Sequence, residues 1–322
     1  MLGAMRFGLA IPQYGFSVPS GEIGFGDATA WARRAEELGF DSVWVSDHFF
    51  YSFGRYGADP SPIAALEPLT ALAGIAAATS RVRLGVIVLA AGFRPPALVA
   101  TAAATIDRLS AGRFELGLGA GWLEDEFTAF GYPFGSVRER FDELERVLKE
   151  LTRRLADASP PLPHPVQDPF PIWLGGKGGP RLLRLAARHA AGWNLVWRAA
   201  PDRYGAALED VALACEREGR DPATFRRTVG LYGIVGATEE EARARFQRAR
   251  ASFPGDAMRD ETWDSWRADT LSGSAEQVIK RVEAFAALGV EELILSPWAL
   301  PFAVIEPEIV EIFASRVIPA CR

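Results

Sequence analysis

Apolar residues follow two alternating patterns along the chain, short continuous runs and longer stretches with a helical period. Continuous runs are typical of strands covered on both faces, and the periodic stretches predict amphipathic helices between them. The predicted strands are residues 5–11, 41–46, 82–89, 113–119, 170–175, 192–197, 228–235 and 291–296. Eight such strand–helix units favour an α/β fold of the closed parallel (β/α)8 barrel type over an open doubly wound sheet, which stays the alternative.

Helix boundaries have their own local signals. Glycine follows the predicted helix at Gly39, Gly192 and Gly289, where it predicts a left-handed helix end just before the next strand. Ser or Thr three residues before Glu or Gln predicts three helix starts by capping boxes. These pairs are Ser136 with Glu139, Thr238 with Glu241 and Ser274 with Gln277.

No linker divides the sequence, so we expect one domain over residues 1–322. Residues 253–273 form a longer insertion between two late helices, and this insertion carries Trp263 and Trp266. It could cap a site, and an ordinary surface excursion explains it equally well.

Composition and charge narrow the class of partner. The 35 basic and 41 acidic residues give a net charge of −6 that is spread along the chain, so no basic surface for nucleic acid or an anionic membrane is expected. Cys215 and Cys321 lie far apart, which argues for a reducing cytoplasm rather than a disulfide framework. Neither a signal peptide nor a bilayer-spanning stretch is found. We therefore expect a soluble cytoplasmic protein that acts on a small-molecule substrate.

The predicted strand ends are rich in aromatic residues and glycines. In a parallel barrel these ends and the loops after them build the active site. A setting with few charges suits a planar, largely apolar ligand with one anionic tail. The candidate substrate-pocket residues are Gln13, Tyr14, Phe50, Phe93, Trp122 and Trp298.

A glycine-rich turn after the fifth predicted strand is the candidate seat for the anionic tail. Gly175, Gly176, Lys177, Gly178 and Gly179 lead directly into a helix that we expect to begin at Pro180. Free N–H groups and the helix dipole would favour a phosphate there, and Lys177 adds a positive charge. A tight turn before a helix is the simpler alternative.

His48 is the candidate for proton chemistry. It follows Asp47 at the end of the second predicted strand, in a chain with only three histidines. A lone histidine is more often structural, but an imidazole at a strand end among aromatic rings can exchange a proton near neutral pH. Because adjacent side chains on a strand point to opposite faces, we expect one of the pair to face the ligand and the other to anchor the loop.

Other signatures are weak or missing. The segment "ELGLGAGW" is a poor match to a dinucleotide-binding fingerprint, and no nucleotide P-loop is found. Three scattered histidines predict no metal site.

Four segments together resemble the luciferase-like monooxygenase superfamily, and within it the branch that uses the deazaflavin coenzyme F420. They are "MRFGLAIPQ", "DSVWVSDHF", "PIWLGGKGG" and the long block from "ATSRVRLGVIVLAAGFRPP" to "GAGWLEDEFTAFGYPF". The resemblance implies a TIM-type barrel with insertions, a homodimer, and a redox ring lying across the strand ends. It also implies that His48 lies near the hydride-carrying carbon and that a cis peptide joins Ile87 to Val88. The cofactor contacts that it implies are Asp47, Ile87, Val88, Ala90, Ala120, Gly121, Trp197 and the turn Gly175 to Gly179.

One position departs from the family's sugar-phosphate dehydrogenases. Trp122 stands where those enzymes have an acidic glutamate, which makes a polar sugar phosphate doubtful and favours a hydrophobic or conjugated substrate. The resemblance thus implies hydride transfer between coenzyme F420 and such a substrate. An FMN-dependent monooxygenase of the same fold and a non-catalytic flavin-binding barrel are the alternatives. Substrate identity and reaction direction stay open.

Overall fold

The computed structural model of the chain describes residues 5–18, 20–157 and 163–322. Eight parallel strands close into a barrel in the order β1–β12–β9–β8–β7–β6–β5–β2, which confirms the predicted fold class. All eight predicted strands are present in this barrel. Their bounds are β1 Arg6–Ala10, β2 Ser42–Val45, β5 Arg83–Ala90, β6 Phe114–Gly119, β7 Ile172–Gly175, β8 Gly192–Trp197, β9 Arg226–Tyr232 and β12 Glu292–Ser296.

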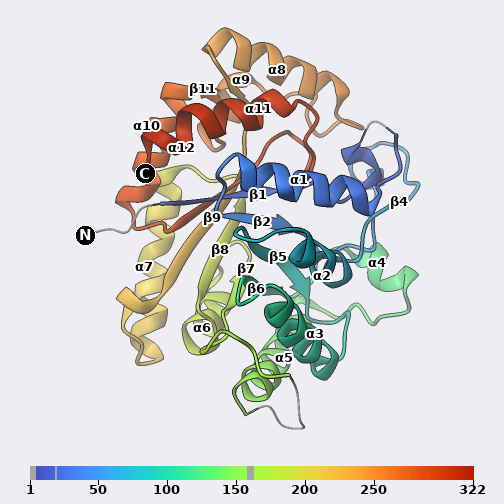
Figure 1. Ribbon diagram of the computed structural model, residues 1–322, viewed down its shortest axis with the longest axis vertical. Coiled ribbons are helices and arrows are strands. Elements are labelled where there is room, and N and C mark those ends of the chain that lie inside the picture. The colour runs from blue at the N-terminus through green and yellow to red at the C-terminus, as the bar shows by residue number, and fades with distance from the viewer. Residues whose placement is uncertain (1–4, 19, 158–162) are drawn as a thin grey trace.

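Helices surround the barrel on the outside, as Figure 1 shows. The longer helices are α1 Phe25–Glu37, α2 Pro68–Ala78, α3 Pro96–Leu109, α5 Val137–Asp157, α6 Pro180–His189, α7 Pro201–Arg217, α8 Glu239–Ser252 and α10 Ala275–Ala287. Short elements decorate the loops, namely α4 Glu124–Ala129, α9 Trp263–Ala268, α11 Pro307–Ile312, α12 Ile318–Ala320, β3 Phe50–Tyr51, β4 Ile63–Ala64, β10 Val235–Gly236 and β11 Gly273–Ser274. Among the described residues, no helix is both long and apolar enough to cross a membrane.

Two of the three predicted glycine helix ends are confirmed. Gly39 and Gly289 have φ values of +84° and +77°, which suit glycine because it lacks a Cβ atom. The prediction for Gly192 is wrong, since α6 ends two residues earlier on an extended Ala190 and Gly192 begins β8. Glycine is needed there for another reason, because a Cβ atom would lie 2.0 Å from the carbonyl oxygen of Arg226.

The capping boxes predicted at Ser136 and Ser274 are both formed. The third is half formed, because Thr238 accepts from the N–H of Glu241 while Glu241 accepts from Ala237 instead.

Strand β5 deviates from regular pairing near its carboxyl end. Its register against β6 shifts between Val86 and Leu89, and the Ile87–Val88 peptide is cis, as the resemblance implied. A second cis peptide joins Val196 to Trp197. The Val88 side chain occupies space that neighbouring glycines leave open, since a Cβ atom at Gly119 or Gly175 would lie 2.5 Å from a Val88 methyl carbon.

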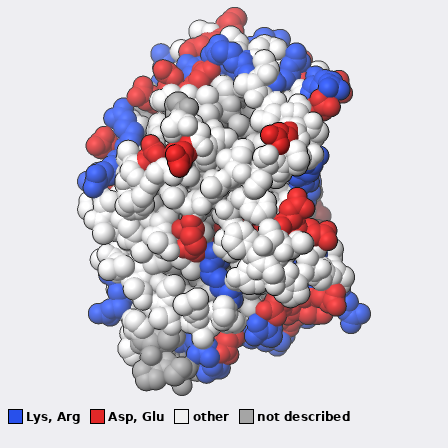
Figure 2. Space-filling view, turned by 90° about the vertical axis from the view of Figure 1, so that its right-hand side faces the viewer, with Lys and Arg blue, Asp and Glu red and all other residues white. Residues whose placement is uncertain are grey.

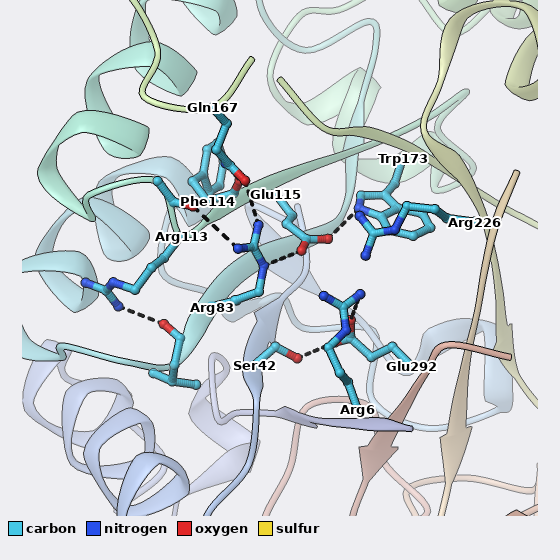
Figure 3. A network of polar contacts seen from close by, with 12 residues as sticks. Arg6, Ser42, Arg83, Arg113, Phe114, Glu115, Gln167, Trp173, Arg226 and Glu292 are labelled. Carbon is cyan, nitrogen blue, oxygen red and sulfur yellow. Dashed lines mark hydrogen bonds and ion pairs between the residues drawn. The ribbon is translucent and has the colours of Figure 1, made fainter. Parts of the chain in front are cut away.

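Charged residues meet inside the opposite end of the barrel, where the strands begin (Figure 3). Glu115 accepts from the Trp173 indole N–H at 2.5 Å and pairs with Arg83. Glu292 pairs with Arg6 at 3.2 Å, and both glutamates are at most 1% exposed. This end of the barrel is thus filled by paired charges.

The insertion packs its two tryptophans inward rather than forming a surface excursion. Trp263 and Trp266 are buried, and the Trp266 ring stacks on Tyr232 with centroids 5.8 Å apart. Tyr232 stacks in turn on Trp197 at 5.8 Å. The insertion therefore supports the end of β8 from outside.

Candidate active site

A cavity of about 710 Å³ opens at the carboxyl ends of the barrel strands. This end faces right in Figure 1, and Figure 2 looks onto it: uncharged side chains cover most of that face, and most charges lie towards its edge. The predicted residues that line the cavity are Tyr14, Asp47, His48, Ile87, Val88, Ala90, Phe93, Ala120, Gly121, Trp122, Gly175, Gly176, Lys177, Gly179 and Trp197. The structure thus brings most of the candidate residues together at one cavity.

Four candidates lie outside the cavity wall. The Gln13 side chain is buried and donates to the carbonyl oxygens of Ser46 and Leu66, so it serves the packing of two loops. Gly178 faces the ring of Trp193, 2.8 Å from where a Cβ atom would lie, and it has a φ of +82°.

The other two are aromatic residues that pack elsewhere. Phe50 belongs to the small β3–β4 sheet and stacks on Phe130, with centroids 6.3 Å apart. Trp298 is 2% exposed and lies in the hydrophobic core. The rings of Phe50 and Trp298 therefore lie away from the cavity wall.

His48 follows β2 and is joined to Glu126 of helix α4. Its Nδ1 atom lies 2.6 Å from Oε2 of Glu126, and the two side chains are 12% and 1% exposed. The other carboxylate oxygen accepts the backbone N–H groups of Phe49 at 2.6 Å and Phe50 at 3.3 Å. One buried carboxylate therefore holds both the imidazole and the backbone that follows it.

Asp47 is anchored by a bidentate ion pair with Arg94, with both N–O distances at 2.8 Å. It also accepts the backbone N–H of Ala90 at 2.9 Å, which fastens the end of β2 to the end of β5. Burial raises the pKa of the Asp47 carboxyl, an effect that the Arg94 guanidinium opposes. Asp47 and His48 are both anchored and both line the cavity, so the expected division of roles between them is wrong.

Tyr14 contributes a hydroxyl that is already engaged. Its oxygen is hydrogen-bonded to Oγ of Ser46, and Ser46 Oγ lies 2.9 Å from Oε1 of Gln13. Burial raises the pKa of the Tyr14 hydroxyl well above its ordinary value of 10.0. The hydroxyl is therefore a neutral member of a buried hydrogen-bonded chain.

Basic side chains lie on the side of the cavity formed after β7 and β8. Arg198 is neutralised by Glu261 at 2.7 Å and Asp269 at 2.8 Å. Lys177 and Arg203 are exposed, and neither has an ion-pair partner among residues 5–18, 20–157 and 163–322. Helix α6 begins beside them at Pro180, as predicted, without a side-chain cap. Its first N–H groups and these two cations suit an anionic group.

Trp122 stands at the mouth of the cavity. It is 48% exposed and its ring lies 5.7 Å from the His48 ring. The Arg55 guanidinium carbon lies 4.7 Å from the centroid of the Trp122 ring. A large apolar surface thus borders the candidate proton carrier.

Glu126 is the important residue that sequence reasoning missed. In "WLEDEF", Glu124 and Asp125 are exposed, whereas Leu123, Glu126 and Phe127 form the buried face of the short helix. A carboxylate on that apolar face was the available signal. Within the described residues, no three histidine, cysteine, aspartate or glutamate side chains are grouped to hold a metal ion.

Comparisons with known proteins agree with the geometry. Residues 5–292 match the family profile described as Luciferase-like monooxygenase. A phthiodiolone/phenolphthiodiolone dimycocerosates ketoreductase of Mycobacterium sp. (strain JLS) is 34% identical over 257 residues, which cover 68% of this chain and 67% of that protein. An F420-dependent glucose-6-phosphate dehydrogenase of Kineococcus radiotolerans is 34% identical over 235 residues, with 68% and 67% covered. These matches span about two thirds of the relatives' length.

A solved structure supports the fold. An F420-dependent secondary alcohol dehydrogenase, in complex with an F420-acetone adduct, superimposes with a TM-score of 0.78 at 22% identity and covers 99% of both chains.

Proposed function

This chain belongs to the luciferase-like monooxygenase family, and from that premise we propose that it is an oxidoreductase that transfers a hydride between coenzyme F420 and a hydrophobic organic substrate. The observation that carries the proposal is the cavity at the strand ends, where an anchored imidazole and an apolar wall meet the exposed cations Lys177 and Arg203. Two relatives point the same way, because one is named as F420-dependent and another as a ketoreductase.

The residues present fit coenzyme F420. A flat redox ring needs a wide apolar slot, and Gly119 and Gly175 have no room for a Cβ atom beside the Val88 side chain that lines the cavity. Lys177, Arg203 and the start of α6 would hold the anionic tail, while Ala90, Ala120 and Trp197 would border the ring. When bound, the coenzyme supplies or accepts a hydride, that is, a proton together with two electrons.

His48 is proposed to hold the proton that accompanies the hydride. Its Nδ1 atom faces Glu126, so Nε2 is the ring atom available to a substrate oxygen. General acid–base groups of this kind contribute about 10²- to 10⁴-fold to a rate.

The substrate is proposed to be a hydrophobic carbonyl compound or the matching alcohol. Trp122 at the cavity mouth and the rings of Tyr14, Tyr51 and Phe302 offer apolar contact and little to recognise a second phosphate. The homodimer and the cytoplasmic location stay predictions from the sequence.

Turnover with purified protein tests the proposal. Reduced F420 is mixed with a series of apolar ketones, oxidised F420 with the matching secondary alcohols, and the coenzyme's absorbance is followed with time. We expect turnover with at least one member of each series and little with glucose 6-phosphate. Oxygen consumption with reduced FMN and no F420 turnover would favour the FMN-dependent monooxygenase, and binding without any turnover would favour the non-catalytic barrel.

A further inference from the structure

We propose that Glu126 is a positioning residue that holds His48 as the Nδ1–H tautomer, so that Nε2 is the atom presented to the cavity. The catalytic consequence rests on the proposed function, whereas the tautomer itself follows from the contacts around the imidazole.

The direction of the bond between Glu126 and His48 follows from the neighbouring donors. Oε1 of Glu126 receives the backbone N–H groups of Phe49 and Phe50, and a backbone N–H can only donate. A carboxylate is an acceptor at both oxygens, so Oε2 accepts from Nδ1 of His48 at 2.6 Å. A histidine whose Nδ1 carries the proton has its lone pair on Nε2 when neutral.

Surrounding rings keep the imidazole in this orientation. The ring centroid of His48 lies 6.2 Å from Tyr14, 5.9 Å from Tyr51 and 5.7 Å from Trp122. The preceding residue, Asp47, is fixed by its ion pair with Arg94. No hydrogen-bond partner for Nε2 is found in the described part of the chain, whereas Nδ1 is engaged.

Tyr14, another proton donor in the cavity lining, is committed elsewhere. The Gln13 amide nitrogen donates to two carbonyls, at Ser46 and Leu66, so its oxygen is the acceptor. Ser46 Oγ therefore donates to that oxygen at 2.9 Å and must accept from the Tyr14 hydroxyl. The Tyr14 proton is therefore directed to Ser46 Oγ, so Tyr14 does not compete with His48 Nε2 as a proton donor.

The proton balance is then simple. A carbonyl substrate would receive a hydride with its two electrons at its carbon, which is the chemistry that reduced F420 supplies when bound. The C=O π pair would move onto the oxygen, and that oxygen would take a proton from Nε2 of the His48 imidazolium. His48 is left as the neutral Nδ1–H tautomer, and Glu126 keeps its charge throughout. Alcohol oxidation runs the same transfers backwards.

Nitrogen-15 NMR of the full chain tests the tautomer without any cofactor. Histidine is labelled selectively, and because the chain has only three histidines, the His48 signals are assigned by their loss in His48→Gln. We expect neutral His48 to carry its proton on Nδ1. A proton on Nε2 in the wild-type protein would overturn the inference without need of any variant.

Glu126→Gln provides the decisive variant. Its amide oxygen should keep the two backbone N–H groups, so its NH₂ group turns to Nδ1 and donates, which moves the ring proton to Nε2. The matched control is Glu124→Gln, an exposed change in the same helix that should leave the tautomer unchanged. An unchanged tautomer in a folded Glu126→Gln protein would also overturn the inference.

Kinetics separate this inference from the proposed function. We expect Glu126→Gln to slow single-turnover hydride transfer about 10- to 100-fold, to change its pH profile, and to leave F420 affinity within about twofold of wild type. If the tautomer changes as expected but the wild-type protein transfers no hydride, the positioning role stands and the proposed function falls. If hydride transfer is found but Glu126→Gln matches wild type in rate and pH profile, the positioning role falls and the proposed function stands.

Discussion

The two ends of the barrel both bury carboxylates, but they surround them differently. Where the strands begin, Glu115 and Glu292 are enclosed by arginines, indole N–H groups and a serine, and the network fills the space inside the barrel. Where the strands end, Asp47 and Glu126 are equally buried, yet each holds a neighbour that borders a cavity of about 710 Å³.

This difference separates stability from chemistry. Burying a charge is costly, so each buried carboxylate needs partners wherever it lies. A site for chemistry also needs an atom left free to react, and the His48–Glu126 pair has one, because Nδ1 of His48 is engaged while His48 borders the cavity. In parallel barrels the strand ends carry the chemistry and the strand beginnings carry stability, in line with this contrast.

At the barrel end where the strands terminate, the largest effect is expected from replacing His48. His48→Ala should slow single-turnover hydride transfer about 10²- to 10⁴-fold, because the proton carrier is removed, while cofactor binding is retained. Stopped-flow mixing measures the rate and a binding titration measures the affinity. Wild-type rates in the variant would make His48 a purely structural residue.

The matching change at the barrel end where the strands begin should act on stability. Glu115→Ala leaves Arg83 and the Trp173 N–H without their buried partner, which should cost about 3–5 kcal/mol of unfolding free energy. Urea unfolding measures the loss, and Glu124→Ala is the exposed control. If the folded variant instead lost F420 affinity, the division between the two ends would be wrong.

Lys177→Ala should weaken F420 binding by about 1.5–3 kcal/mol, the usual contribution of a charge-assisted contact, and leave the saturated rate unchanged. Isothermal titration measures the affinity. An unchanged dissociation constant would move the anionic tail away from the turn before α6.

A packing change tests the slot beside the ring. Gly175→Ala should cost about 1–3 kcal/mol in stability or F420 affinity, since its Cβ atom would meet the Val88 side chain at 2.5 Å. Val88→Ala combined with it should recover part of that loss. A neutral Gly175→Ala would mean that the Val88 side chain moves freely, so that it could not shape the cavity.

The smallest effect concerns how Glu115 and Glu292, the buried carboxylates where the strands begin, respond to pH. Burial and the nearby Glu115 raise the pKa of Glu292 above its ordinary 4.5, so its stabilising contribution is present below that value and is lost as pH rises through its folded pKa. Glu115 behaves oppositely. Burial raises its pKa, but Arg83, Arg226 and Arg6 lower it by more, so the net shift is downward. The stabilising contribution of Glu115 is therefore lost as pH falls below about 4.5. Unfolding curves over pH should therefore lose their high-pH decline in Glu292→Gln, and a decline unchanged in that variant would contradict the assignment.

Much of this organisation could be predicted from the sequence, because buried strands and strand-end positions follow from local pattern. All eight barrel strands were predicted, with bounds that differ from the observed ones by at most three residues, and His48, Trp122 and Lys177 were found by their place after a strand. What could not be predicted depends on partners far along the chain. Gln13 and Trp298 have suitable chemistry but are engaged in internal packing, and Glu126 lies 78 positions from the histidine that it holds.

The central claim is that the cavity at the carboxyl ends of the strands binds coenzyme F420. The most direct measurement is a titration of the purified apoprotein with F420 and with FMN, followed by fluorescence under identical conditions. F420 should bind at least about tenfold more tightly, a difference of about 1.4 kcal/mol. Equal affinity for the two cofactors, or FMN retained through purification, would contradict the account.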